Sequence, residues 1–136
     1  MSQNILPHTQ NETLWEIASQ IIAEQTKSIE NMKSILCSCT RLENPPEAVC
    51  RYQRHMNDIM SAMFDRMRRA RATRRVDCDF LREMLPHHKG AVEMASITLQ
   101  SDICPELVPI LQAIITSQET GIAQMEALAA SLRCRC

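Results

Sequence analysis

One stretch decides how the rest of the chain is interpreted: Phe80-Leu81-Arg82-Glu83-Met84-Leu85-Pro86-His87-His88-Lys89-Gly90-Ala91-Val92-Glu93-Met94-Ala95. Its apolar residues recur every three or four positions, which is the period of a helix with one buried face. Two adjacent histidines stand in its middle, with a methionine on either side. Because Pro86 lacks a backbone donor, we expect a kink just before the histidines. The stretch therefore predicts a core helix that carries potential metal ligands.

Composition favours a single all-helical domain. The chain has 136 residues, two glycines and 3% aromatic residues, and long apolar patterns of helical period run through it. The pattern predicts a four-helix bundle with helices near 13–37, 46–74, 78–101 and 105–133. We expect residues 1–11 to be a flexible leader, residues 12–133 to form the domain, and residues 134–136 to be a Cys-x-Cys tail.

Charge and hydropathy exclude several classes of partner. The net charge is −1, so no global field attracts nucleic acid or anionic membranes. An arginine-rich run at 66–75 lacks the stacking aromatics of a nucleic-acid groove. No apolar run approaches the roughly 20 residues of a membrane span. Since the first twelve residues also lack an apolar signal-peptide core, we expect a cytoplasmic protein without a nucleic-acid or membrane partner.

The histidine pair and its neighbours suggest a soft-metal site. His87 and His88 lie about 100° apart on a helix, so both can border one face. Met84 stands one turn before His87, and Met94 lies two turns after it. Neutral imidazole and thioether suit Cu(I) or Ag(I), whereas Mg²⁺ or Ca²⁺ needs more oxygen ligands. Four more candidate ligands lie in the preceding helix: His55, Met56, Met60 and Met63. A methionine row at helical spacing is more often core packing.

A repeated pattern supplies candidate partners for the imidazoles. When residues 107–125 are compared with residues 14–32, the apolar positions match and Gln118 falls on Gln25. A glutamine in the centre of both apolar stripes suggests buried hydrogen bonds that orient the imidazoles. Asp79 and Glu83 could also approach His87 from one side. In a metal-free protein, the same histidines and glutamines would form a buried polar network.

Seven cysteines are an unusual number for a chain expected in the cytoplasm. Two Cys-x-Cys pairs, Cys37/Cys39 and Cys134/Cys136, follow the helices with the repeated pattern. Thiolates two residues apart can bind a soft ion or form disulfides. The two pairs could meet as a four-sulfur site at one end of the bundle, remain free, or serve as a redox sensor.

No catalytic constellation is found in the sequence. A carboxylate-bridged di-iron centre in a helical bundle needs Glu-x-x-His on two helices, but the chain offers only Glu83-x-x-x-His87. It also lacks a nucleophile elbow, a P-loop and a dinucleotide fingerprint. We therefore expect a protein that is not an enzyme.

The stretch from Asp77 to Ala95 resembles the bacterial family called domain of unknown function 305. The resemblance rests on Met84-Leu85-Pro86-His87-His88, on Ile114-Ile115-x-x-Gln118 with Ile122-x-x-Met125, and on a methionine-rich lead-in, and it covers about residues 50–132. It implies a ferritin-like four-helix bundle and a role in handling copper or silver, often in exported proteins. The chain departs from the family pattern at Lys89, where glutamine is usual, and at Gly121, where glutamate is common.

The leading hypothesis is a small binding or sequestration protein for a soft metal, with copper(I) as the expected ion. The main alternative is a metal-free structural or interaction module, and a homodimer is a further expectation.

Overall fold

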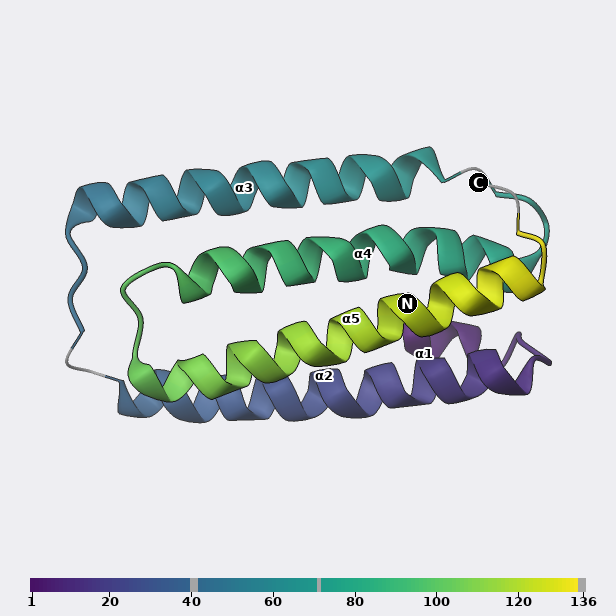
Figure 1. The fold of residues 1–136 in the computed structure, drawn as a ribbon, viewed down its shortest axis with the longest axis horizontal. Helices are drawn as coiled ribbons and strands as arrows, with labels where there is room; N and C mark the ends of the chain where they lie inside the picture. The colour runs from purple at the N-terminus through teal and green to yellow at the C-terminus, as the bar shows by residue number, and fades with distance from the viewer. Residues whose placement is uncertain (40–41, 71, 135–136) are drawn as a thin grey trace.

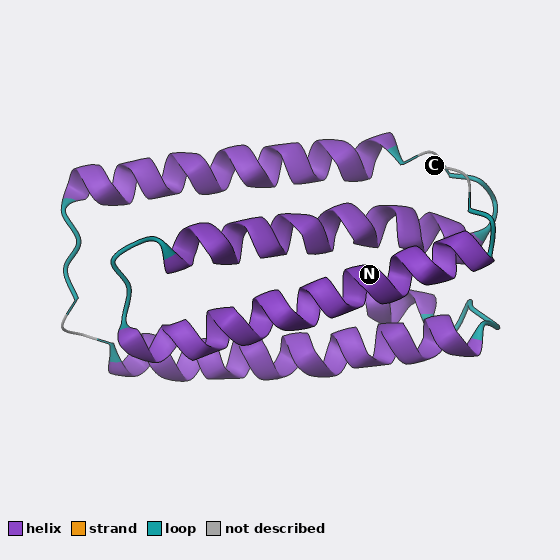
Figure 2. Ribbon diagram, viewed as in Figure 1, coloured by secondary structure: helices purple, strands orange, loops and turns teal. Residues whose placement is uncertain are grey.

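The computed structural model describes residues 1–39, 42–70 and 72–134, and these residues are entirely helical apart from their connections (Figures 1 and 2). The elements are, in order, α1 (Ser2–Ile5), α2 (Glu12–Ser38), α3 (Pro46–Arg69), α4 (Val76–Leu99), the 3₁₀ turn η1 (Pro105–Leu107) and α5 (Val108–Ser131). The predicted all-helical class is confirmed. None of the described helices is long and apolar enough to cross a bilayer.

The helix ends follow from local sequence signals. The Asn11 side chain caps α2 by accepting a hydrogen bond of 2.9 Å from the Leu14 backbone N–H. Pro46 occupies the first turn of α3, where its missing donor costs nothing. The helix predicted at 46–74 corresponds to α3, which ends earlier, at Arg69. The helix α4 continues through Pro86.

The four long helices lie in an open row rather than in a closed square. Packing runs from α3 to α4, from α4 to α5 and from α5 to α2, and Figure 1 shows α3 and α2 as the outer members. In a closed bundle α3 would also pack along α2, and these two helices make no comparable contact. Each outer helix therefore has a flank without a long helical neighbour among the described residues.

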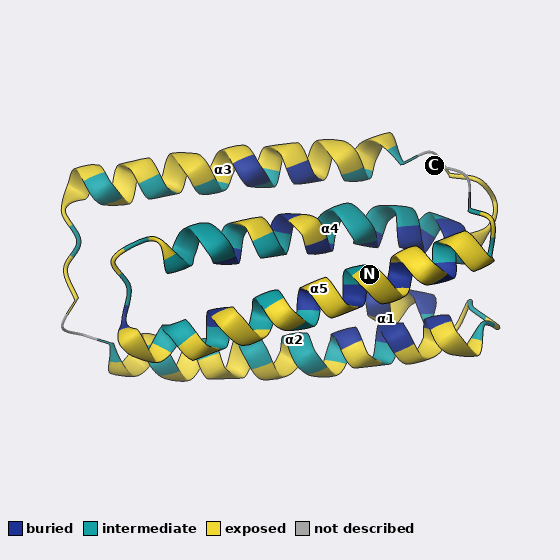
Figure 3. Cartoon of the chain, viewed as in Figure 1, coloured by how far each residue is buried: buried dark blue, intermediate teal, exposed yellow. Residues whose placement is uncertain are grey.

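The hydrophobic core lies at the end of the row where α2 and α4 begin and α5 ends (Figure 3). Leu14 of α2, Leu81 of α4 and Met125 of α5 are completely buried there. The N-terminal segment differs from the flexible leader that we expected. It folds into α1 and buries Ile5, which is 5% exposed, in the same core. Burial of the Ile5 side chain in the core stabilises the packing of α1 against the rest of the protein.

Candidate functional site

A pocket of about 280 Å³ lies where α1 begins, between α1, α2 and α4. Met84 and His87 line it from α4, and α2 contributes Gln25 among its polar residues. The other lining residues are Met1, Ser2, Gln3, Ile21, Ile22, Thr26 and Ile29. Since pockets for drug-sized molecules start at roughly 300 Å³, this one suits an ion with its ligands or a very small molecule.

His87 is the only ionisable side chain among the described residues that line this pocket. Its ring is half-buried, and its Nδ1 atom is buried with no hydrogen-bond partner among the described residues. Burial lowers the pKa of His87 below its usual value, and the positive Met1 amino group lowers it further. The imidazole is therefore neutral at pH 7 and has the lone pair that a metal ligand requires.

His88 is buried between α4 and α5, with 1% of its surface exposed. It packs on Gly121 of α5: a Cβ atom at that position would lie 3.1 Å from the His88 Cδ2 atom and 3.3 Å from Nε2. Burial, and then the neighbouring His87, lower the pKa of His88 to about 4, although the Met84 carbonyl opposes the shift. No described group lies in hydrogen-bond geometry with its Nδ1 atom.

The two imidazoles are close to each other but have different surroundings. Their ring centres are 5.9 Å apart and their planes are tilted by 57°. The sequence predicted that both imidazoles can border one apolar face. In the structure they have different neighbours: His87 lines the pocket beside α1 and α2, and His88 packs against α5.

The expected orienting role of the glutamines is not seen in the hydrogen bonds. Gln118 is 4% exposed, but its Oε1 atom has no hydrogen-bond partner among the described residues. The Nδ1 atoms of His87 and His88 have no hydrogen-bond partner there either. Gln25 is half-buried and shares the pocket with His87. The structure thus brings Gln25 into the same pocket as His87, but Gln25 forms no hydrogen bond to the His87 Nδ1 atom.

The other candidate ligands are more dispersed. Met63 of α3 packs against Gly90 of α4, where a Cβ atom would come within 2.7 Å of the methionine sulfur. Met56, Met60 and Met94 are half-buried on α3 and α4. His55 is exposed and lines a separate groove with Tyr52. Packing therefore accounts directly for Met63, and His55 lies in a different groove from His87.

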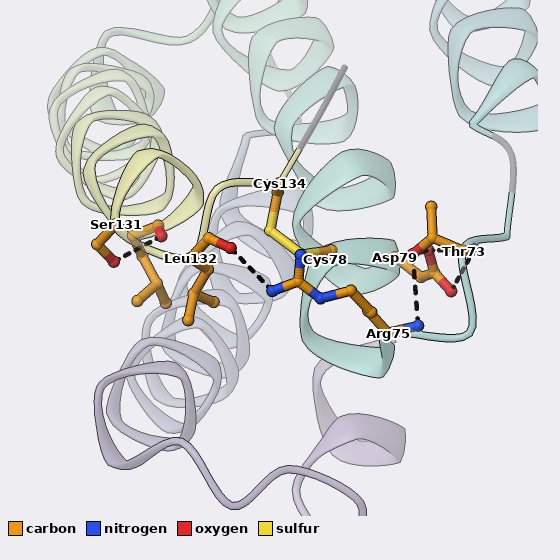
Figure 4. The surroundings of a disulfide bond; sticks show 8 residues. Thr73, Arg75, Cys78, Asp79, Ser131, Leu132 and Cys134 are labelled. Carbon is orange, nitrogen blue, oxygen red and sulfur yellow. Dashed lines mark hydrogen bonds between the residues drawn. A yellow bond between two sulfur atoms is a disulfide. The ribbon is translucent and has the colours of Figure 1, made fainter.

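Asp79 has a structural role instead of the predicted approach to His87. Its carboxylate accepts hydrogen bonds of 2.8 and 3.0 Å from the Thr73 backbone N–H and of 2.6 Å from the Thr73 hydroxyl (Figure 4). It therefore fixes the turn that leads into α4, because a carboxylate near a helix start satisfies free donors. Glu83 is half-buried one turn before His87.

The cysteines contradict the predicted four-sulfur site. Cys39 forms a disulfide with Cys104, and Cys134 forms one with Cys78 (Figure 4). The two bonds lie at opposite ends of the row because α2 and α5 run antiparallel, so their C-termini point in opposite directions (Figure 1). Cys37 is free and exposed, as is Cys50, and Cys136 lies outside the described residues.

Sequence reasoning missed several participants. Met1 gave no signal, because the first eleven residues were expected to be flexible. The partners Cys78 and Cys104 lie far from Cys134 and Cys39 in sequence, at separations of 56 and 65 residues. Gly121 was noted only as a departure from a family pattern, yet its missing side chain makes room for His88. Lys89, the other departure, forms an exposed ion pair of 2.7 Å with Glu126.

The described residues contain no group of three or more His, Cys, Asp or Glu side chains arranged to hold a metal ion. A metal site with three or more ligands among the described residues would therefore need donors other than these four residue types, such as thioether sulfur.

Comparison with known proteins gives one match. The family model described as "Domain of unknown function (DUF305)" matches residues 1–129, which includes α1 and α2 as well as the histidine motif. No curated protein and no solved structure matches the chain.

Proposed function

We propose that this chain, which belongs to the DUF305 family, binds a soft monovalent metal ion such as Cu(I) at the pocket beside His87. The observation that carries the proposal is a neutral imidazole whose buried Nδ1 atom has no partner, in a pocket that also holds the thioether of Met84. A buried polar atom without a partner costs roughly 1–3 kcal/mol. A metal ion bound to that nitrogen would remove this cost.

The available donors favour a soft ion over a hard or borderline one. Zinc sites use three or four His, Cys, Asp or Glu ligands, and no such group occurs in the described residues. Imidazole and thioether together suit Cu(I) and Ag(I). Met84 is 2% exposed, so its sulfur would bind in a largely water-free environment.

His88 is proposed as a second imidazole ligand. Two imidazoles that bind one ion at about 2 Å per metal–nitrogen bond have ring centres roughly 5–6 Å apart. The observed 5.9 Å separation of His87 and His88 lies within this range. Participation of Met94, Met56, Met60 and Met63 stays a prediction, and so does the expectation that the protein is not an enzyme.

We propose that the open row of four long helices is an opened variant of a ferritin-like bundle. Such bundles place metal ligands on the inward faces of neighbouring helices, and His87 and Met84 occupy comparable positions on α4.

The two disulfides favour an oxidising compartment over the cytoplasm that the sequence predicts, because disulfides rarely persist in the cytosol.

A metal-free structural module is the second candidate function. It is supported by the close packing of His88 on Gly121 and by the buried Gln118 nearby in the sequence of α5. Under this alternative, Cu(I) would leave the melting temperature unchanged. A ligand that binds only the native state at 100 times its Kd would instead stabilise the protein by about 2.7 kcal/mol.

The test is an anaerobic titration with Cu(I) against a competing chromophoric chelator. Ascorbate keeps the copper reduced without adding thiols, and Cys37→Ser, Cys50→Ser and Cys136→Ser remove competing thiolates. We expect the affinity to fall at least tenfold in His87→Ala, and also in Met84→Leu, which keeps the side-chain volume.

The matched controls are His55→Ala on α3 and Met32→Leu on α2, which should bind Cu(I) as tightly as the parent protein. Unchanged binding in a His87→Ala/His88→Ala variant would refute the site.

A further inference from the structure

The open flank of α2 carries a regular row of apolar side chains. Trp15, Ile22, Ile29 and Leu36 are spaced seven residues apart, so they lie along one side of the helix. Ile22 and Ile29, in the middle of this row, also line the pocket beside His87. Trp15 is 50% exposed, Ile29 48% and Leu36 79%. Such a row is typical of a helix that packs against another helix, yet this chain leaves most of it exposed to solvent.

The flank of α3 has a matching apolar stripe. Val49 and Phe64 are 38% and 46% exposed. Met60 and Met67 lie on the same side as Phe64, at the helical spacings of four and three residues, and are half-buried. Both outer helices of the row thus present apolar side chains that the other described helices leave at least partly exposed.

Charge and cysteine positions specify how these stripes would pair. The start of α2 carries exposed Glu12 and Glu16, and the end of α3 carries exposed Arg66, Arg68 and Arg69, of which Arg68 pairs with Asp65. These two termini lie at the same end of the molecule because α2 and α3 run antiparallel (Figure 1). The exposed free thiols of Cys37 and Cys50 lie toward the opposite end, near the end of α2 and the start of α3.

We propose that a second copy of this chain covers both flanks, with α2 of each copy packed antiparallel to α3 of the other around a two-fold axis parallel to the helices. This arrangement pairs acidic with basic helix ends and places Cys37 of one copy near Cys50 of its partner. It gives each outer helix the second neighbour that a closed bundle would supply. A two-fold dimer forms this contact twice, so all four exposed stripes are covered. The proposal does not require a bound metal, although the partner copy would lie beside the His87 pocket because Ile22 and Ile29 also line it.

A crosslinking experiment tests the pairing directly. In a Cys136→Ser background, Cys50→Ser leaves only the Cys37 thiol, and Cys37→Ser leaves only the Cys50 thiol. Oxidised glutathione joins two thiols by accepting two electrons and two protons, and is itself reduced to two thiol molecules. We expect each variant alone to remain at 15.5 kDa on a non-reducing gel, and an equal mixture to give a band at twice that mass. No band in the mixture, or an equally strong band from one variant alone, would overturn the proposed pairing.

Sedimentation provides a second test that does not depend on cysteine. We expect the wild-type chain to sediment as a dimer, and Leu36→Glu or Phe64→Glu to weaken dimerisation at least tenfold. Mixing these two variants should partly restore the dimer, because one of the two α2–α3 contacts is then intact. The matched control is Val76→Glu, an apolar residue 49% exposed at the start of α4, which should stay dimeric. A wild-type monomer at 100 µM, or dimers of undiminished strength in both variants, would refute the proposal. Cu(I) binding measured on the same samples separates this outcome from failure of the metal site.

Discussion

The helices α3 and α4 have the same length, 24 residues, and very different environments. Seven residues of α4 are buried, whereas only Ile59 and Met63 of α3 are. The difference arises because α4 lies between α3 and α5, whereas α4 is the only described element with which α3 makes extensive contact. Both sequences have a clear helical period. An amphipathic pattern therefore predicts a helix but not how many neighbours it will have.

Covalent bonds reinforce the same contrast. The disulfide Cys39–Cys104 links the end of α2 to the loop before α5, and Cys78–Cys134 links the start of α4 to the segment after α5. The only cysteine of α3 is the free Cys50. The helices α2, α4 and α5 thus form a disulfide-linked unit, and α3 is attached to it by packing and by its chain connections.

The largest expected effect comes from removing a disulfide of the linked unit. Cys78→Ser/Cys134→Ser should lower the free energy of unfolding by about 4 kcal/mol, because the bond restricts a loop of 56 residues in the unfolded chain. Urea denaturation measures this change. The matched control, Cys37→Ser/Cys50→Ser, alters exposed free thiols and should shift stability by no more than about 0.5 kcal/mol. An equal loss of unfolding free energy in both double variants would show that the Cys78–Cys134 bond does not stabilise the folded protein.

Acid should destabilise the linked unit next most strongly. The folded protein keeps His88 neutral down to about pH 4, whereas an unfolded histidine takes up a proton below about pH 6.5. The free energy of unfolding is therefore unaffected by this histidine above pH 6.5. It falls by about 3 kcal/mol as the pH is lowered toward 4, because the unfolded chain takes up a proton that folded His88 does not. The lowered pKa of His87 acts in the same direction.

Urea midpoints measured from pH 7 to pH 4 on metal-free protein test this dependence. His88→Gln should flatten the slope between pH 6.5 and pH 5, where few carboxylates titrate. His55→Gln, an exposed histidine of α3, is the control and should keep the wild-type slope. A slope unchanged by His88→Gln would contradict the buried neutral state.

A smaller and local effect is expected where α3 meets α4. In Gly90→Ala the new Cβ atom would lie 2.7 Å from the Met63 sulfur and 3.1 Å from its Cβ atom, so the Met63 side chain must move and the α3 backbone must give way slightly. We expect a cost of about 1–3 kcal/mol, seen as faster amide exchange in α3 than in the wild type. Exchange in the core of α5 should change little. Met63→Ala combined with Gly90→Ala should relieve the clash, and uniform protection across α3 in Gly90→Ala would count against this packing.

Much of the candidate site could be predicted from sequence because its residues are close together in the chain. Met84, His87 and His88 lie within five positions on one helix, so helical geometry alone relates them. The repeated pattern also indicated Gln25, which does share the pocket with His87. Asp79 was misjudged because a carboxylate at a helix start can serve the backbone as readily as a neighbouring histidine.

The sequence by itself determined the helical class, the approximate helix ends and the histidine motif, because helical period, caps and prolines act over a few residues. Tertiary structure alone decided which side of α4 each histidine faces, which cysteines pair, and that the outer helices leave their flanks open. These features depend on contacts between segments far apart in the sequence, as in the disulfides, whose cysteines are 65 and 56 residues apart. Such contacts are set by the packing of whole helices, and a local pattern does not encode which neighbour each face will meet.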